Sequence, residues 1–326
     1  MDGCQDAEDV TTMPNTLFFH NHKYGHPHLP NGFFSPRGVV FLSDGYAWYS
    51  GVNFGGSITR VSLNEPDWSS IKVWIAKCFG DSNPTESDYK PGTSYKRIYW
   101  PFASSGNLRK AIDEVALTQS FVALRLLLTK MQEIFQCIEP APANVQSYGH
   151  KIRELLLLAA MEVEASCAAV LTANKYLSTA RMTTNDYVKL LSPMLLDSYS
   201  LTLASYPDFP SFAPFEHWSS TNPTQSLGWY HAYNMTKHNR EEYLNVATLE
   251  KAVHAVGAAV VMFYAQFGFS FGTGDDKIAA IRSVFRVSPD YERYPTSCYI
   301  PNVKSCDDEA GVISWDWELL DYAFPQ

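Results

Sequence analysis

The chain has 326 residues and a formal net charge of −9 at pH 7. Its 46% hydrophobic and 18% charged residues argue against a disordered protein and supply the material for a sizeable core. The negative charge argues against a protein that grips nucleic acid over a broadly basic surface, because that binding needs many cations to neutralise phosphates. Any nucleic-acid contact should therefore be a local basic site.

The acidic N-terminus lacks the apolar core of a signal peptide, and the longest apolar run, residues 255–265, is too short to cross a bilayer. Six scattered cysteines without a C-x-x-C pair are typical of reduced thiols. We therefore expect a cytoplasmic protein that makes no contact with a membrane.

A flexible tail is expected over residues 1–15 and a β-rich domain over residues 16–105. Two apolar runs flank Ser43-Asp44-Gly45, and an Asp-Gly pair at such a place is typical of a hairpin turn. Alternating apolar residues predict a further strand, at Ile71, Val73 and Ile75. Short strands of this kind indicate a small sheet.

The apolar period becomes helical near Asn107, which predicts a helical bundle over residues 106–268. Thr248 is expected to cap its last helix and Gly268 to end it. A C-terminal extension is expected over residues 269–326. The fold class that follows is α+β, with a β-rich N-terminal domain and a mostly α-helical bundle.

The helix predicted over residues 147–174 is apolar on more than one face. In addition to its main apolar stripe it carries Leu157, Leu158 and Met161. A helix that is apolar nearly all round is usually buried on all sides. We therefore expect this helix to be the central one in the bundle.

The most distinctive segment is residues 229–242, which read WYHAYNMTKHNREE and are expected to be helical. Side chains three and four residues apart share a helix face. This spacing puts Asn234, His238 and Glu241 in one polar row with Lys237 beside it. It directs Trp229, Tyr233 and Arg240 to the opposite side, toward the core.

A histidine between two cations can serve as general acid or base while the cations stabilise a developing phosphorane. These are the parts of a metal-independent ribonuclease, with His238, Arg240, Lys237 and Asn234 as the candidate catalytic residues. RNA is the candidate partner, and no cofactor is implied. The alternative is a non-catalytic interaction protein in which the same residues stabilise the bundle.

Three charged residues of the predicted helix 147–174 need partners if they are buried. Arg153 and Glu164 project at nearly the same angle, and Glu162 lies on the opposite flank. With Lys237 and Arg240 as further cations nearby, the sequence predicts an internal network of ion pairs.

Four histidines crowd into nine residues, at His20, His22, His26 and His28. Imidazoles at this density can bind Zn²⁺ or Ni²⁺. Glycine and prolines make the segment an irregular loop, however, and no cysteine or acid pair joins it. We therefore predict no metal site.

The residues PFEHW at 214–218, the pattern W-Y-x-x-Y-N-x-x-K-H-x-R-E from Trp229, and the ending AQFG at 265–268 carry a resemblance. Over about residues 145–268 the chain looks like a family of uncharacterised bacterial proteins. More distantly it is similar to HEPN domains, helical bundles that include many ribonucleases of toxin and anti-phage systems.

The HEPN resemblance implies an arginine, four to six residues, and then a histidine just before the last helix. His238 lies at that place, whereas Ala232 and Tyr233 occupy the spacings of the arginine and Arg240 follows the histidine. Such sites are commonly completed across a two-fold axis. The resemblance thus implies an effector of a bacterial stress or anti-phage system and a homodimer with residues 229–242 at or next to the interface.

Overall fold

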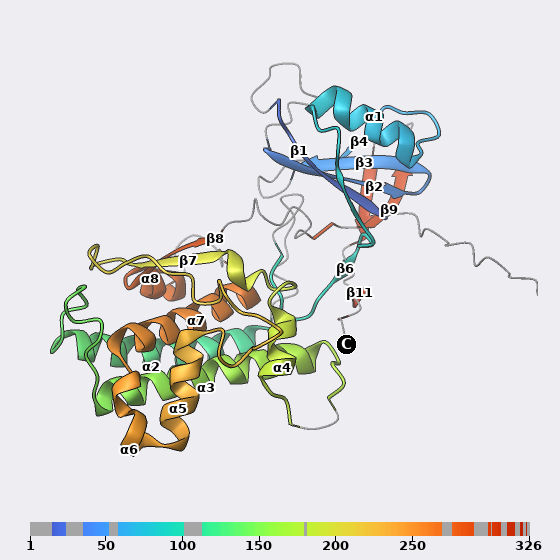
Figure 1. Ribbon diagram of the computed structural model, residues 1–326. Helices are drawn as coiled ribbons and strands as arrows, with labels where there is room; N and C mark the ends of the chain where they lie inside the picture. Colours follow the sequence, from blue (N-terminus) through green and yellow to red (C-terminus); the bar gives the residue numbers. More distant parts are fainter. Residues whose placement is uncertain are drawn as a thin grey trace, which may run out of the picture. The chain divides into compact units, whose positions relative to one another are not determined.

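The computed structural model describes residues 15–23, 35–51, 58–100, 113–178, 181–268, 276–289, 299–300, 302–307, 312–316, 320–321 and 324. The chain divides into two compact units. The first comprises Met1–Thr93, Pro101–Gly106 and Cys298–Leu320, and the second comprises Ser94–Trp100, Asn107–Ser297 and Asp321–Gln326. The strands of the N-terminal half and the helices that follow confirm the predicted α+β class (Figure 1). The predicted tail, residues 1–15, lies outside the described residues except for its last one.

The first unit contains an antiparallel sheet in the order β4-β3-β2-β1-β5. The bounds of these strands are β1 Thr16–His20, β2 Arg37–Ser43, β3 Tyr46–Gly51, β4 Thr59–Arg60 and β5 Thr85–Ser87. The hairpin predicted at Asp44-Gly45 is confirmed, because Ser43 pairs with Tyr46 and both turn residues have positive φ, 53° and 76°. This left-handed pair matches the twist of the strands that it joins.

The predicted strand at Ile71–Ile75 is wrong, because residues Trp68–Phe79 form helix α1. Asp67 caps the helix in a capping box with Ser70, and Gly80 ends it with φ 80°. Ile71, Ile75 and Phe79 recur every four residues and pack on the sheet, whereas Val73 between them is exposed. The alternation of Ile, Val and Ile was therefore a fragment of a helical period.

Phe19 of β1 lies over Gly38, its direct partner on β2. A Cβ atom at position 38 would overlap this ring, with Cε1 only 2.6 Å away. The ring is fully buried and contacts the ring of Phe79 of α1 at 4.5 Å between centroids, so it has little room to move aside. Gly38 therefore makes the space that lets α1 dock.

We expect Gly38→Ala to lower the free energy of unfolding of the first unit by about 1–3 kcal/mol, the usual cost of overpacking a core. Phe19→Leu in the same chain should recover part of this loss by removing the overlapping ring. Gly228→Ala is the control, since a Cβ there meets nothing within 4 Å. Denaturant titration measures all three, and a Gly38→Ala protein as stable as the control would contradict the close packing.

Two further pairs of strands involve the C-terminal part of the chain. β9 Asn302–Asp307 pairs with β10 Val312–Asp316 as a hairpin, and β6 Thr93–Ser94 pairs with β11 Leu320–Asp321. The extension predicted over residues 269–326 is therefore partly strand.

The second unit is a helical bundle around α7 (Figure 1). Its longer helices are α2 Glu114–Phe135, α3 His150–Ala173, α5 Gly228–His238 and α7 Leu249–Phe267. The shorter ones are α4 Thr184–Tyr187, α6 Arg240–Tyr243, α8 Asp276–Arg282, η3 Val188–Leu190, η4 Leu196–Ser198 and η5 Leu244–Val246. The predicted ends of the last bundle helix are confirmed, since the Thr248 hydroxyl accepts from the Lys251 amide and Gly268 has φ 85°.

Helix α7 is buried more completely than α3, which corrects the prediction that α3 is buried on all sides. Every residue from Ala255 to Phe267 is buried. On α3 the expected stripe is buried too, but Leu158 and Met161 are exposed. Among the described residues α3 is the one helix long and apolar enough to cross a membrane, and half of that stretch is buried inside the protein. This is typical of a core helix at the side of a bundle.

A β-ribbon packs on α7. β7 Tyr199–Leu203 pairs with β8 Phe285–Pro289, and Leu201 exchanges two backbone hydrogen bonds with Phe212 on the other edge of β7. The Phe212 ring fills the space above Gly257 of α7, where a Cβ would lie 2.6 Å from it, and stacks on His254 at 4.2 Å. The extension is thus part of the bundle at β8.

Candidate functional site

An open hollow of about 350 Å³ lies where α5 ends and α6 begins. It is lined by Arg153, Lys237, His238, Asn239, Arg240 and Glu241. Three of the four candidate catalytic residues, Lys237, His238 and Arg240, therefore meet in one place. The fourth, Asn234, does not line the hollow, because it lies a turn back on α5 and its amide donates to the Tyr230 carbonyl at 3.4 Å.

A break in the helix produces this arrangement. Asn239 has φ −141° and ψ 87°, so α5 ends at His238 and a new helix begins at Arg240. The Asn239 side chain accepts from the Glu242 amide and donates to the Glu242 carboxylate, which caps α6. Arg240 was predicted to point into the core, and this is wrong. The break turns it into the hollow, where it is exposed.

His238 and Arg240 are both exposed side chains. Within the described part of the chain, neither has a hydrogen-bond or ion-pair partner, and Glu241 has none either. The imidazole and the guanidinium are thus available to a ligand without the loss of an internal contact.

Lys237 is held in place by a chain of polar contacts that reaches α3. Its ammonium donates to the Tyr233 hydroxyl at 2.8 Å and lies 4.9 Å from the centre of that ring. The Tyr233 and Tyr230 hydroxyls donate to the two oxygens of Glu164, at 3.3 and 2.5 Å. Burial and, for Tyr230, the neighbouring carboxylate raise the pKa of both phenols, so they stay protonated donors at neutral pH.

Arg153 of α3 binds the C-terminal end of α5. Its Nε and Nη2 donate to the Thr236 carbonyl at 3.2 and 2.7 Å, an acceptor in the last turn of the helix that lacks an amide partner there. A cation at this end also opposes the negative end of the helix dipole. Arg153 therefore fixes the position of His238 through the backbone two residues earlier.

The predicted network of ion pairs is wrong. Glu164 is satisfied by two phenols, Arg153 by a backbone carbonyl, and no ion pair joins Glu162, Glu164, Lys237 or Arg240 in the residues that the structure describes. Glu162 lies apart from the network, and burial raises the pKa of its carboxyl. Tyrosine hydroxyls, and not cations, bind the Glu164 carboxylate. A hydroxyl satisfies the carboxylate without burying a second charge, which would also lose its hydration.

We expect Glu164→Gln to lower the free energy of unfolding by about 1–2 kcal/mol, because both phenols lose a charged acceptor. Glu162→Gln, on the same helix, should change it by less than about 0.5 kcal/mol, since it removes no hydrogen bond. Urea titrations of the two variants test this directly. Equal stabilities would show that the Glu164 network contributes nothing.

Two other candidate groups carry little chemistry. His20 and His22 stack at 6.2 Å between ring centres, while His26 and His28 lie outside the described residues. No group of three or more His, Cys, Asp or Glu side chains that could hold a metal occurs in the part of the chain described. Cys167, buried in α3 beside a small apolar cavity, has a raised pKa because of that burial and is an unreactive thiol.

No protein-family model, no curated protein and no solved structure matches this chain. The resemblance to HEPN domains and to the bacterial family thus stays a prediction from the sequence.

Proposed function

We propose that the hollow binds the phosphodiester backbone of RNA and cleaves it without a metal ion, with His238 as the proton-transfer group. The observation that carries this proposal is the pair His238 and Arg240, which are both exposed, both line one open hollow, and both lack an internal partner among the residues that the structure describes. Both side chains are presented to solvent in the same hollow as the ammonium group of Lys237.

The chemistry follows from the residue types. His238 removes the proton of a ribose 2′-hydroxyl, whose oxygen then forms a bond to phosphorus while the bond from phosphorus to the 5′-oxygen breaks. The imidazolium returns a proton to the leaving 5′-oxygen. Arg240 and Lys237 stabilise the charge on the non-bridging oxygens of the phosphorane. The products are a 2′,3′-cyclic phosphate and a free 5′-hydroxyl.

Local charge supports an anionic ligand at this place. The lining carries three permanent cations, Arg153, Lys237 and Arg240, against one carboxylate, Glu241. The chain as a whole has a net charge of −9. A basic hollow on an acidic protein restricts phosphate binding to one place, which suits a short stretch of single-stranded RNA better than a long duplex.

The test is incubation of the purified full chain with tRNA and with single-stranded RNA in EDTA. We expect fragments that end in a cyclic phosphate, no cleavage of DNA of the same sequence because it lacks the 2′-hydroxyl, and a rate that falls with added salt. Cleavage of DNA at the same rate would contradict the 2′-hydroxyl mechanism. Intact RNA throughout would contradict the ribonuclease assignment.

A second function is supported by a different observation. Lys237 and Arg153 both have internal partners. Lys237 donates to Tyr233 of the same helix, whose hydroxyl donates in turn to Glu164 of α3, and Arg153 of α3 donates to the Thr236 carbonyl of α5. This favours a non-catalytic interaction protein in which the segment stabilises the bundle and presents Arg240 to a partner. Under that function His238 could be replaced without loss of any activity. The role as effector in a bacterial stress or anti-phage system, which the HEPN resemblance implies, belongs to the first proposal.

A further inference from the structure

The outer side of helices α2 and α3 carries an apolar surface that remains exposed among the described residues. Five of the eight large apolar side chains that are exposed in the described residues lie on these two helices. They are Val115, Val122 and Leu126 of α2 and Leu158 and Met161 of α3. We call these five residues the α2–α3 face. Leu126 and Met161 are 58% and 55% exposed, so more than half of each side chain contacts water.

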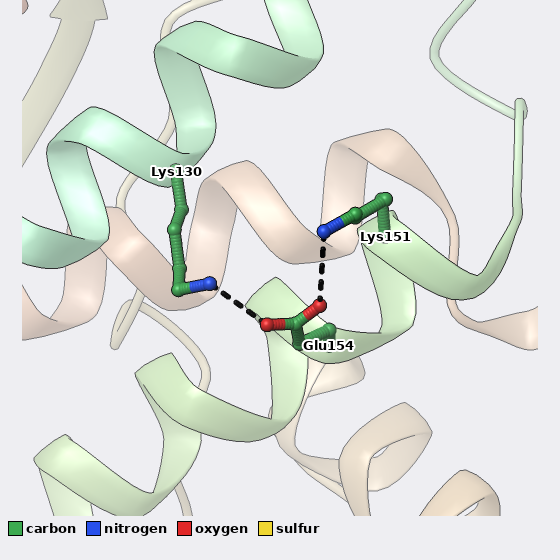
Figure 2. A network of polar contacts seen from close by, with 3 residues as sticks. All are labelled: Lys130, Lys151 and Glu154. Carbon is green, nitrogen blue, oxygen red and sulfur yellow. Dashed lines mark hydrogen bonds and ion pairs between the residues drawn. The ribbon is translucent and has the colours of Figure 1, made fainter.

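The two halves of this face are adjacent. Helix α3 packs against α2, and Glu154 of α3 lies between Lys130 of α2 and Lys151 of its own helix (Figure 2). Leu126 precedes Lys130 by four residues, and Leu158 follows Glu154 by four. Each leucine therefore lies about one helical turn from the ion pair, on the same side of its helix. The two leucines thus form one continuous surface across α2 and α3.

The composition of α3 supports the same conclusion. This helix is apolar enough over 18 residues to pass for a membrane span, yet only half of that stretch is buried inside the protein. Single exposed apolar residues are ordinary on soluble proteins, whereas a row of them along two neighbouring helices marks an interaction surface. The apolar composition of the unburied half of α3 is explained if the surface of another molecule covers it.

We propose that the α2–α3 face is the interface of a homodimer, in which it packs against the same face of a second copy. The proposal is independent of the ribonuclease assignment. Its first support is charge. Apart from Arg153 and Glu164, which contact α5, the two helices carry three cations and four acids: Arg125, Lys130 and Lys151, and Glu114, Glu133, Glu154 and Glu162.

This near-neutral mixture can meet itself across a two-fold axis, where cations of one copy face acids of the other. A partner with a strongly acidic or strongly basic surface would gain no electrostatic attraction to this face. The balance of charge thus favours a second copy over an acidic or basic partner.

The second support is size. Helices of 22 and 24 residues are about 33 and 36 Å long at 1.5 Å per residue. Two packed helices present a face about 20 Å wide. Length multiplied by width gives a face of about 700 Å² per copy. This area is close to the roughly 800 Å² that each partner buries in a stable complex. Four helices packed in this way form an intermolecular bundle.

The test is the mass of the full chain in solution, measured by sedimentation equilibrium. We expect twice 36.7 kDa for the unmodified protein. Leu126→Glu and Met161→Glu should each raise the dissociation constant of the dimer about thirtyfold or more, as for a buried residue at the centre of an interface. Both should keep the melting temperature of the monomer, because the replaced side chains are exposed within one chain.

Val73→Glu is the matched control, because Val73 is an exposed valine of α1 in the other unit, and this variant should stay dimeric. A monomeric unmodified protein at 100 μM or so would overturn the proposal, since interfaces of this size hold at that concentration. A dimer that withstands both glutamates would overturn it as well. If such a dimer separates on Arg240→Glu, the interface lies at residues 229–242 instead.

Discussion

Replacement of His238 by alanine is expected to lower the rate of RNA cleavage by about two to four orders of magnitude, the usual contribution of a positioned acid–base group. The melting temperature should remain that of the unmodified protein. The reason is that the imidazole is exposed and makes no hydrogen bond within the described residues, so its removal leaves no buried partner unsatisfied. The rate is measured on single-stranded RNA in EDTA, and stability by thermal unfolding of the same samples.

His217→Ala is the matched control for this experiment. His217 is also an exposed histidine of the second unit, but it lies outside the hollow. Its removal should leave the rate unchanged. If His238→Ala keeps the full rate, His238 is not the acid–base group, and the interaction protein becomes the better account of the motif. A joint loss of rate and stability would instead assign His238 to the structure.

Acidification from pH 6.5 to pH 4 is expected to remove about 3 kcal/mol of stability from the helical unit through His254 alone. Burial against Phe212 lowers the pKa of this imidazole from 6.5 to about 4. In the unfolded chain it binds its proton at the ordinary value, so below pH 6.5 the unfolded state takes up protons first and stability falls with pH. The loss is complete below about pH 4, and a difference of about 2.5 pKa units sets its size at roughly 1.4 kcal/mol per unit.

His254→Phe should remove this part of the pH dependence, because a phenyl ring keeps the stacking on Phe212 and cannot be protonated. The measurement is a series of urea titrations between pH 4 and pH 7 on both proteins. The carboxylates titrate in both, so the difference between the two curves isolates His254. His217→Phe provides the control for a new ring at an exposed site. Parallel curves for the His254→Phe and unmodified proteins would contradict a lowered pKa of the half-buried His254.

Local signals in the sequence were sufficient for the hairpin and for the ends of the last bundle helix. Asp44-Gly45 permits a turn with two positive φ angles, and Thr248 and Gly268 mark the ends of α7 through hydrogen bonds and backbone freedom that depend on a single residue. The strand predicted at Ile71–Ile75 failed because three alternating residues also fit a helix. The Asp67–Ser70 capping box and Gly80 around it were the signals that distinguish the two.

The candidate site was predictable in its residues but not in its geometry. Lys237, His238 and Arg240 do come together, yet through a helix break that a continuous helical period cannot reveal. Asn239 three residues before Glu242 is a capping pattern, and it could have indicated the new start. The partners of Glu164 could not be predicted, because the choice between a tyrosine and a lysine depends on how α5 packs on α3.

The ribbon of β7 and β8 determines where this protein can be shortened. Residues Asp276–Pro289 follow the last bundle helix, and a sequence-based domain boundary after Gly268 would discard them. Without β8, one edge of β7 would expose its backbone amides and carbonyls, with Tyr199 and Leu203 beside them. An open apolar strand edge pairs readily with other chains. The segment after α7 thus covers one edge of β7, and shortening the chain before Asp276 should promote aggregation.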